Sequence, residues 1–296
     1  SIAECFNRNF VFARENEPRL SLLKKIDSGI RFIPVLDDDN KLMMVVSADF
    51  LPLKQQKKTY IRSRAPVRIS FGGGGSDLTR YFINDSGAVI NGAISLFSHA
   101  TMQVLDDERI IINSSDLNDT LIATNLEDAC SRTDCNKFDL ILSLIKIIKP
   151  PFGFELSINS DFTVGSGLGG SATMCAAVLG CFNHLKNDRW DQHELAEIAF
   201  QAERLSMGIA GGWQDQYASV FGGINFLEFR ADETLIFPLR IDPNTLSELE
   251  ESLVLCNTGI LHNSGEIHVN QRESINESRI KKNVKRNVDL TYRIRS

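Results

Sequence analysis

A glycine-rich loop at residues 165–171, with the sequence Gly-Ser-Gly-Leu-Gly-Gly-Ser, most constrains how this chain can fold. An alternating, strand-like run at 154–159 precedes the loop, and an apolar, helix-like run at 172–185 follows it. Glycine lets the backbone approach a ligand closely, and the start of a helix adds unpaired N–H groups and the positive end of a dipole. The arrangement favours a binding loop for an anion, above all for the phosphates of a nucleotide.

Three interpretations of this loop compete. Gly165, Gly167 and Gly170 fit the dinucleotide-binding fingerprint, but that motif needs a second strand where 191–207 shows a second helical pattern. The spacing of Gly165, Gly170 and Ser171 also approaches a P-loop, but the lysine expected before the hydroxyl is absent. The third interpretation is a tight turn without a ligand, because glycine clusters commonly serve turns. Neither motif is satisfied, so the rest of the sequence has to decide.

The composition limits the class of protein. With 296 residues and 43% hydrophobic content, the chain can bury an extensive core, and we expect more than one domain. Its formal net charge of −6 gives no basic excess, so nucleic acid and anionic membranes are not expected partners. No apolar run reaches about 18 residues, and no signal-peptide pattern stands at the N-terminus. The six cysteines form no C-x-x-C pair, which favours a reducing, cytoplasmic compartment.

Residues 1–53 indicate a small α/β unit. The expected elements are a strand at 9–12, a helix at 18–28, and strands at 32–36 and 41–47. The helix and the last two strands resemble one repeat of the CBS domain family, whose repeats work in pairs and often bind adenine nucleotides. The resemblance implies a partner repeat upstream or in another chain, for example in a homodimer.

The ligand motif of that family is incomplete here. Ser47-Ala48-Asp49 is one residue shorter than the family's Ser/Thr-x-x-Asp pattern, so a packing or dimerisation module is an equal alternative. The polar residues 54–59 are the expected linker to the rest of the chain.

A second glycine run follows the linker. Residues 60–71 alternate in the manner of a strand and lead into Gly72-Gly73-Gly74-Gly75-Ser76-Asp77. Four consecutive glycines allow a ligand to approach the backbone, and the carboxylate of Asp77 is able to accept hydrogen bonds from sugar hydroxyl groups. The alternative role for Asp77 is to cap a helix at 78–83. The two roles are not exclusive.

Two further acids stand in informative contexts. Glu203 lies near the end of the helical pattern at 191–207, where the alternative is a solvated surface acid. Asp215 follows a third glycine-rich segment at 208–212, where the alternative is a turn residue. Other expected elements are strands at 88–94, 99–105, 110–114 and 221–229, and helices at 137–149 and 278–295.

The order and contexts of these motifs resemble the GHMP kinase superfamily, which includes galactokinase, homoserine kinase and mevalonate kinase. The resemblance covers residues 60–276. The blocks at 64–78 and 211–217 are most similar to the heptose 7-phosphate kinases and related sugar kinases.

The resemblance implies an α+β fold. A ribosomal protein S5 domain 2-like, ATP-binding N-terminal domain is expected at 60–235, and a truncated ferredoxin-like C-terminal domain at 236–296, preceded by the CBS-like βαββ unit at 1–53. The third glycine-rich motif of the family has no counterpart in this chain. We therefore expect the sequence to be an excerpt cut at both ends.

The resemblance also implies roles for individual residues in phosphoryl transfer from ATP. Asp215 is expected to orient or deprotonate the acceptor hydroxyl, and Arg68 to lie beside Asp215 and the transferring group. Ser171 and Glu203 are expected to hold Mg²⁺, which prefers oxygen ligands. The expected ATP phosphate-binding residues are Gly165, Ser166, Gly167, Leu168, Gly169, Gly170 and Ser171. The expected substrate-binding residues are Gly74, Gly75, Ser76, Asp77, Gly212 and Trp213.

Three hypotheses for function follow. The first is an ATP-dependent kinase that phosphorylates D-glycero-D-manno-heptose 7-phosphate at the anomeric (C1) hydroxyl, with fucose or galactose as alternative acceptors. The second is a catalytically weak, nucleotide-binding regulatory protein that works through the CBS-like repeat. The third, a dinucleotide-dependent oxidoreductase, lacks the second strand that its fingerprint needs. The histidines show no ligand spacing, so no transition-metal site is expected.

Overall fold

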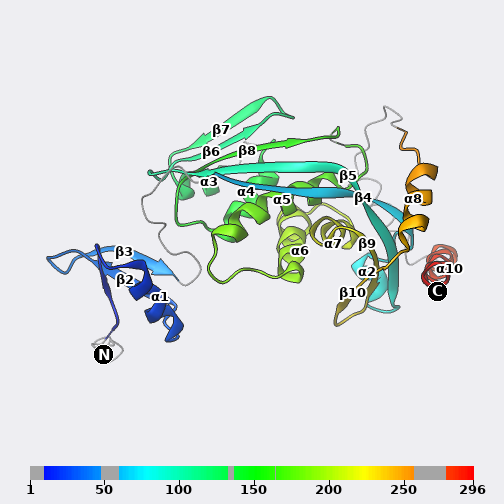
Figure 1. Cartoon of the computed structure of the whole chain (residues 1–296), viewed down its shortest axis with the longest axis horizontal. Helices are drawn as coiled ribbons and strands as arrows, with labels where there is room; N and C mark the ends of the chain where they lie inside the picture. The colour runs from blue at the N-terminus through cyan, green and yellow to red at the C-terminus, as the bar shows by residue number, and fades with distance from the viewer. Residues whose placement is uncertain (1–9, 48–59, 133–136, 164, 257–277) are drawn as a thin grey trace. The chain divides into compact units, whose positions relative to one another are not determined.

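The computed structural model describes residues 10–47, 60–132, 137–163, 165–256 and 278–296 (Figure 1). The chain divides into two compact units, one formed by 1–59 with 182–190 and the other by 60–181 with 191–296. The expected linker at 54–59 and two residues of the Ser47-Ala48-Asp49 motif lie outside the described residues. No helix in the described part of the chain combines the length and apolar character needed to cross a membrane.

The N-terminal unit is a small sheet with one helix. Its strands are β1 (Ala13–Arg14), β2 (Phe32–Leu36) and β3 (Leu42–Ser47) in that order, and its helix is α1 (Arg19–Asp27). β1 pairs with β2 in parallel and β2 with β3 antiparallel, and a small core closes one face of the sheet. The strands expected at 32–36 and 41–47 are confirmed. The strand expected at 9–12 is wrong, because residues 10–12 carry no strand and pairing starts only at Ala13.

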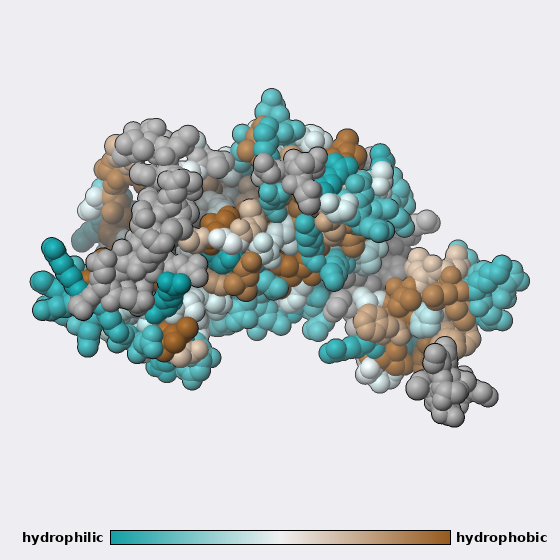
Figure 2. Space-filling view, turned by 180° about the vertical axis from the view of Figure 1, so that it is seen from behind, coloured by the Kyte–Doolittle hydropathy of each residue, from teal (hydrophilic) through white to brown (hydrophobic). Residues whose placement is uncertain are grey.

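Much of the apolar surface of this unit stays exposed. Phe32, Leu42 and Met44 are more than half exposed, at 66%, 61% and 52%. Figure 2 shows hydrophobic colour gathered on this unit, at the right of the view.

The second unit is built on a seven-stranded sheet in the order β10-β9-β5-β8-β6-β7, with β4 paired to β5 outside this path. Its strands are β4 (Tyr60–Gly72), β5 (Gly87–Val104), β6 (Ile110–Ser114), β7 (Asp119–Ala123), β8 (Phe154–Ser160), β9 (Ile224–Phe229) and β10 (Thr234–Pro238). β5 pairs with β4 along one edge, and with β9 and then β8 along the other. The two strands expected at 88–94 and 99–105 are therefore one continuous strand.

Alternate residues of β5 pack against different helices, as expected for a strand buried on both faces. Ala88 and Ile90 lie in a cluster with Val288 of α10 (Ser278–Arg295). Val89 lies in a cluster with Tyr217 of α7 (Gln214–Phe221). The helix expected at 278–295 is thus confirmed, and it closes the face of the sheet opposite to α7.

The helices on the α7 side lie together in Figure 1. They are α4 (Asp139–Ile148), α5 (Gly170–Leu185), α6 (Gln192–Phe200) and α7. The helical pattern expected at 191–207 is continued beyond α6 by a π-helix, η2 (Gln201–Ser206). The remaining helices are α2 (Thr79–Phe82), α3 (Leu126–Ser131) and α8 (Pro243–Ser252). The domain boundary expected at 235/236 falls within β10, which extends the same sheet.

Candidate active site

The glycine loop runs from the end of β8 into α5, which begins at Gly170. Gly165, Gly167 and Gly169 have φ angles of 82°, 76° and 79°, a region in which side chains are strained. A Cβ atom on Gly169 would also lie 3.2 Å from the carboxylate carbon of Asp215. Every second residue of the loop therefore has to be glycine, and the loop lies directly against the acid that the sequence analysis placed beside it.

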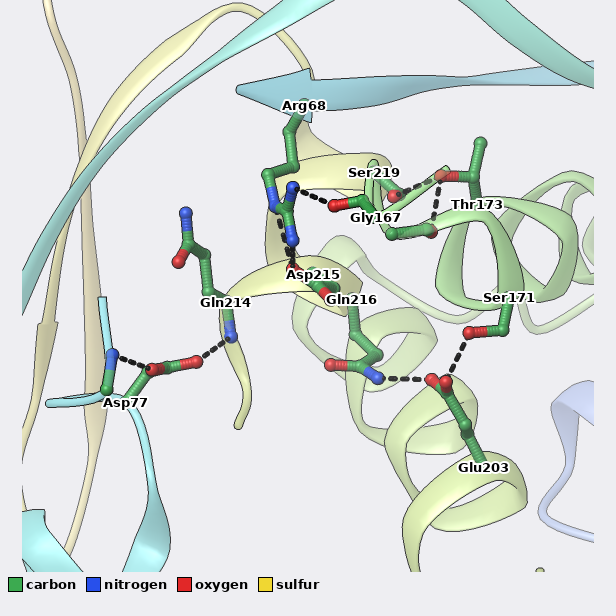
Figure 3. A network of polar contacts seen from close by, with 12 residues as sticks. Arg68, Asp77, Gly167, Ser171, Thr173, Glu203, Gln214, Asp215, Gln216 and Ser219 are labelled. Carbon is green, nitrogen blue, oxygen red and sulfur yellow. Dashed lines mark hydrogen bonds and ion pairs between the residues drawn. The ribbon is translucent and has the colours of Figure 1, made fainter. Parts of the chain in front are cut away.

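Arg68 joins the loop to that acid (Figure 3). Its Nε donates to Asp215 Oδ1 at 2.8 Å, and its Nη2 lies 2.6 Å from the same oxygen. Its Nη1 donates to the carbonyl oxygen of Gly167 at 3.2 Å, and its backbone N–H to Leu168 at 3.5 Å. Charge-assisted contacts of this length are among the strong hydrogen bonds of proteins. The expected neighbourhood of Arg68 and Asp215 is confirmed.

Asp215 occupies the first turn of α7, whose N-cap residue is Trp213. A carboxylate in the first turn interacts favourably with the positive end of the helix dipole. The sequence predicts an acid that faces the acceptor hydroxyl after a glycine-rich segment, but no helix that begins there. The structure shows that the glycines lead into a helix that directs Asp215 toward the loop.

Glu203 is nearly inaccessible, with 1% of its surface exposed, so the surface-acid interpretation is wrong. Its Oε1 accepts a hydrogen bond from the hydroxyl of Ser171, and its Oε2 accepts one from Gln216 Nε2 at 2.6 Å. The predicted metal ligands, Ser171 and Glu203, are therefore in contact. Gln216 was not predicted, although it lies one position after Asp215.

The donors at Ser171 and Glu203 fit Mg²⁺. Both are oxygen donors, and Mg²⁺ is commonly held by one or two carboxylates while nucleotide phosphates and water complete its shell. Among the residues that the structure describes, no group of three or more His, Cys, Asp and Glu side chains is placed to hold a metal by itself.

Asp77 lies on the other side of α7. Its Oδ1 accepts from the backbone N–H of Gly75 and its Oδ2 from that of Gln214, both at 3.1 Å. Burial, and secondly the charge of Asp215, raise the pKa of Asp77 above its ordinary value. A Cβ atom on Gly212 would lie 1.9 Å from Asp77 Oδ2. Asp77 therefore ties the second glycine run to the start of α7.

The capping role considered for Asp77 is wrong. The N-cap residue of α2 is Leu78, and no side chain caps this helix. The carboxylate of Asp77 instead accepts hydrogen bonds from the backbone N–H groups of Gly75 and of Gln214, the first residue of α7.

The second glycine run is held from both ends. Ser76 is fully buried, and its hydroxyl bonds to Gly73 O at 2.7 Å, to Ala88 O at 3.1 Å and to Ala88 N at 3.1 Å. From α10, Asn287 Oδ1 accepts from Gly73 N at 3.3 Å and its Nδ2 donates to Gly74 O at 3.5 Å. The hydroxyl of Ser76 thus contacts the backbone, whereas Cβ atoms built on Gly74 and Gly75 would have no neighbour within 4 Å.

Trp213 stacks on Phe200, with ring centroids 3.6 Å apart and an angle of 11° between the rings. Its Nε1 donates to Thr79 Oγ1 at 3.0 Å. These contacts anchor the segment that precedes Asp215 to α6 and to α2.

Two further residues at the site, Thr173 and Arg204, were not predicted from the sequence. The hydroxyl of Thr173 bonds to Ser219 Oγ and to Gly169 O, both at 2.9 Å, and so links α5, α7 and the loop. Arg204 lies 3.4 Å from Glu203 Oε1 and 3.9 Å from Asp215 Oδ2. The pairing of Arg204 with Glu203, its neighbour in sequence, and with Asp215 of α7 depends on the π-helix, for which the sequence carries no periodic signal.

Comparisons with known proteins agree with this geometry. Residues 138–223 match the family described as the GHMP kinases N terminal domain. The D-glycero-alpha-D-manno-heptose 7-phosphate kinase of Campylobacter jejuni is 36% identical over 225 residues, which cover 74% of this chain and 66% of that protein. The L-fucokinase/L-fucose-1-P guanylyltransferase of Bacteroides fragilis is 29% identical over 195 residues, which cover 57% of this chain and 20% of that protein. The chain thus spans just under two thirds of the first relative and a fifth of the second.

Solved structures show the same fold. A D-glycero-D-manno-heptose 1-phosphate kinase from Bacteroides thetaiotaomicron superposes with a TM-score of 0.62 at 29% identity, covering 73% of each chain. The galactokinase of Lactococcus lactis, at 17% identity, gives a TM-score of 0.56 over 81% of this chain and 70% of that one. With its glycine loop between β8 and α5 and with these relatives, the chain belongs to the GHMP kinase family and carries the N-terminal domain of that family.

Proposed function

We propose that the protein to which this chain belongs is an ATP-dependent kinase of a sugar or sugar phosphate. The observation that carries the proposal is the contact of Arg68 with both Gly167 of the loop and Asp215. Phosphoryl transfer needs a site for the phosphates, an acid at the acceptor hydroxyl, and positive charge where the transferring group passes. A loop, an acid and a guanidinium group are in direct contact here.

The phosphates of ATP would bind at residues 165–171. The backbone of this loop approaches a ligand without hindrance from side chains at its three left-handed glycines, and α5 presents the N–H groups of its first turn. Arg68 stands at the edge of the loop, where its charge compensates that of the transferring group.

Asp215 would orient or deprotonate the acceptor hydroxyl. Arg68 occupies Oδ1 of its carboxylate. A Cβ atom on Gly169 would lie only 3.2 Å from the carboxylate carbon of Asp215, so a hydroxyl bound beside this carboxylate would lie next to the phosphate loop. Because the reacting groups must be held in line, this closeness is the property that the reaction requires.

Ser171 and Glu203 would hold Mg²⁺ between them. When bound, the metal supplies charge neutralisation on the nucleotide phosphates. Gln216 holds the second oxygen of Glu203 and so fixes the direction in which the carboxylate faces.

The acceptor that we propose is D-glycero-D-manno-heptose 7-phosphate, phosphorylated at its anomeric (C1) hydroxyl. The 36% identity to a protein named for that sugar phosphate supports this choice. The residues that we propose to bind the sugar are Gly74, Gly75, Ser76, Asp77, Gly212 and Trp213. The bonds of Asp77 to Gly75 and to Gln214, the residue before Asp215, support this choice. Fucose and galactose are the alternative acceptors, because they appear in the names of relatives that match a smaller share of this chain.

The finer organisation of the chain is part of the proposal. We propose a ribosomal protein S5 domain 2-like domain at 60–235, the beginning of a ferredoxin-like domain at 236–296, and a single CBS-like repeat at 1–53 that serves packing or dimerisation. The βαββ order of the N-terminal unit supports the last assignment. The four cysteines in the described part of the chain form no disulfide with one another, which supports the cytoplasmic location that we propose.

The test is an assay of the full-length protein with Mg-ATP and a panel of heptose 7-phosphate, fucose and galactose. Asp215→Asn is expected to abolish sugar phosphorylation while ATP binding persists. The matched control is Asp119→Asn. Asp119 lies on β7, and its exposed carboxylate pairs with Lys137. Turnover retained by Asp215→Asn would refute the role of Asp215, and ATP binding without turnover of any sugar would favour a regulatory protein.

A further inference from the structure

Arg204 is a second buried guanidinium group at the candidate active site. Its side chain is 7% exposed, and its Nη1 donates to the backbone carbonyl of Ala210 at 3.0 Å. The same Nη1 lies 3.4 Å from Glu203 Oε1, and Nη2 lies 3.9 Å from Asp215 Oδ2. Arg204 thus lies between the proposed metal ligand and the proposed acceptor-orienting acid.

The backbone leaves room for this guanidinium at one glycine. A Cβ atom on Gly211 would lie 2.2 Å from Cζ of Arg204, and 2.4 and 2.5 Å from its two terminal nitrogens. Gly211 has no left-handed φ angle, so its lack of a side chain matters here for space. A side chain at 211 would displace the flexible end of Arg204 and leave the backbone in place.

The two arginines divide the oxygens of Asp215 between them. Arg68 occupies Oδ1, and Arg204 lies on the side of Oδ2. Glu203 is shared in the same way, because Arg204 and Ser171 face its Oε1 while Gln216 holds its Oε2. Arg204 is therefore the cation that faces both acids.

The charges explain why such a cation is needed. Three acids at the site are largely buried: 8% of Asp77, 1% of Glu203 and 15% of the side chain of Asp215 are exposed. Buried carboxylates repel one another strongly. Arg68 contacts only one of the three acids. The distances from Arg204 to Glu203 and to Asp215 are longer than those of a direct charge-assisted hydrogen bond. Arg204 therefore acts on these two acids mainly through its charge and position.

We propose that Arg204 is a positioning residue that holds Glu203 and Asp215 in a fixed relation, so that metal binding and acceptor orientation occur in one geometry. The inference rests on the proposed kinase function. It assigns to η2 a purpose beyond carrying Glu203, since the π-helix places the two consecutive residues 203 and 204 at the same site.

The experiment compares Arg204→Met, Arg204→Lys and Gly211→Ala in the full-length protein. Arg204→Met is expected to lower kcat by roughly 100-fold, the scale of a lost electrostatic group at an active site. KM for the sugar is expected to change less than about threefold, because the interaction acts on the reacting geometry and not on ground-state binding. Arg204→Lys, which keeps the charge, is expected to recover part of the loss. Arg230→Met removes an arginine that pairs with Glu228 and Glu233 away from the site and is the control.

A double-mutant cycle ties the effect to the guanidinium. The single change Gly211→Ala is expected to lower kcat, because the added Cβ displaces the guanidinium group of Arg204. In the Arg204→Met background it is expected to have no further effect. Thermal unfolding of each variant shows whether the variant is folded. Because Gly211→Ala keeps the Arg204 side chain and its charge, a loss of kcat in a folded Gly211→Ala protein reports the displacement of the guanidinium group.

The outcomes separate this inference from the function on which it rests. Variants of Arg204 with kcat within about threefold of an active wild type would overturn the inference alone, as would additive losses in the cycle. A loss that appears in KM and in unfolding temperature, with kcat unchanged, would make Arg204 merely structural. A wild-type protein that phosphorylates no sugar would overturn both proposals.

Discussion

Arg68 and Asp215 lie 147 positions apart in the sequence, yet the guanidinium of Arg68 contacts Asp215 Oδ1 through both Nε and Nη2. The contact joins the long strand β4 to the first turn of α7. Its third nitrogen reaches the carbonyl of Gly167, so the phosphate loop and the acid are held by one side chain. The site is in this sense assembled by a strand and a helix, and the loop closes against both.

Removal of this contact is expected to reduce turnover sharply. Arg68→Met keeps the length of the side chain but removes all three donors, so kcat is expected to fall by about 100- to 1,000-fold. Arg68→Lys keeps the charge but lacks the planar guanidinium group, so its kcat is expected to lie between those of the wild type and Arg68→Met. Steady-state kinetics with Mg-ATP and sugar measure both.

Arg64→Met is the matched control for this prediction, because Arg64 lies on the same strand with its guanidinium 4.5 Å from the ring centre of Phe97. An equal loss of kcat in Arg64→Met and Arg68→Met would assign the effect to β4 as a whole and contradict the prediction.

Gln216 is expected to support metal binding through Glu203. Gln216→Leu replaces a fully buried amide by an apolar side chain of similar size and leaves Glu203 Oε2 without its 2.6 Å donor. Loss of a group that orients a ligand commonly costs about 10-fold or more in metal affinity. The Mg²⁺ concentration for half-maximal activity is therefore expected to rise by about that factor, and excess chelator to abolish turnover in both proteins.

Gln192→Leu, at the exposed start of α6, is the control for this change. An unchanged Mg²⁺ requirement in Gln216→Leu would mean that Ser171 and Arg204 orient Glu203 without Gln216.

Local pattern was enough to predict several elements of the fold. The strands at 32–36 and 110–114 and the helix at 278–295 have the bounds that their alternation and period predict. The long strand β5 was not predicted as one element, because its continuity depends on β4, β8 and β9, which pair with it from distant parts of the sequence.

The site was predicted where residue type and backbone agree. Glycines at alternate positions, followed by a helix, identify the loop, and acids after glycines identify Asp77 and Asp215 as candidates. Arg204 and Gln216 were missed for a different reason. Arg204 faces Glu203 and Asp215 from within the π-helix, and Gln216 contacts Glu203 from another helix; such contacts leave no periodic signal in the sequence.

Asp77 is expected to make stability depend on pH. Because burial first, and the charge of Asp215 second, raise the pKa of Asp77, the native state holds a proton there that the unfolded chain releases from about pH 3.9 upward. The associated stability is complete below that pH and is lost as pH rises through the native pKa. Asparagine does not titrate, so the stability advantage of the wild type over Asp77→Asn is expected to shrink as pH rises.

Thermal unfolding of the wild type and Asp77→Asn between about pH 4 and pH 7 measures this difference. In the Asp215→Asn background, which removes the second cause, the decline is expected to end at a lower pH. An advantage of the wild type that grows with pH would show that Asp77 is stabilised in its charged form.

Trp213 is expected to contribute to the site by holding the segment that precedes Asp215. Trp213→Phe keeps an aromatic ring on Phe200 but loses the 3.0 Å hydrogen bond to Thr79, at a cost of about 1 kcal/mol of unfolding free energy. Thr79→Val removes the acceptor of the same bond, so the two single changes are expected to cost similar amounts and to be less than additive when combined. Chemical denaturation of the three variants measures these losses of unfolding free energy.

If Trp213 also contacts the sugar, as the sequence predicts, Trp213→Phe will raise KM for the sugar while Thr79→Val leaves it unchanged. Equal KM values in the two variants would restrict Trp213 to its supporting role, because the loss of the shared hydrogen bond would then account for the whole effect.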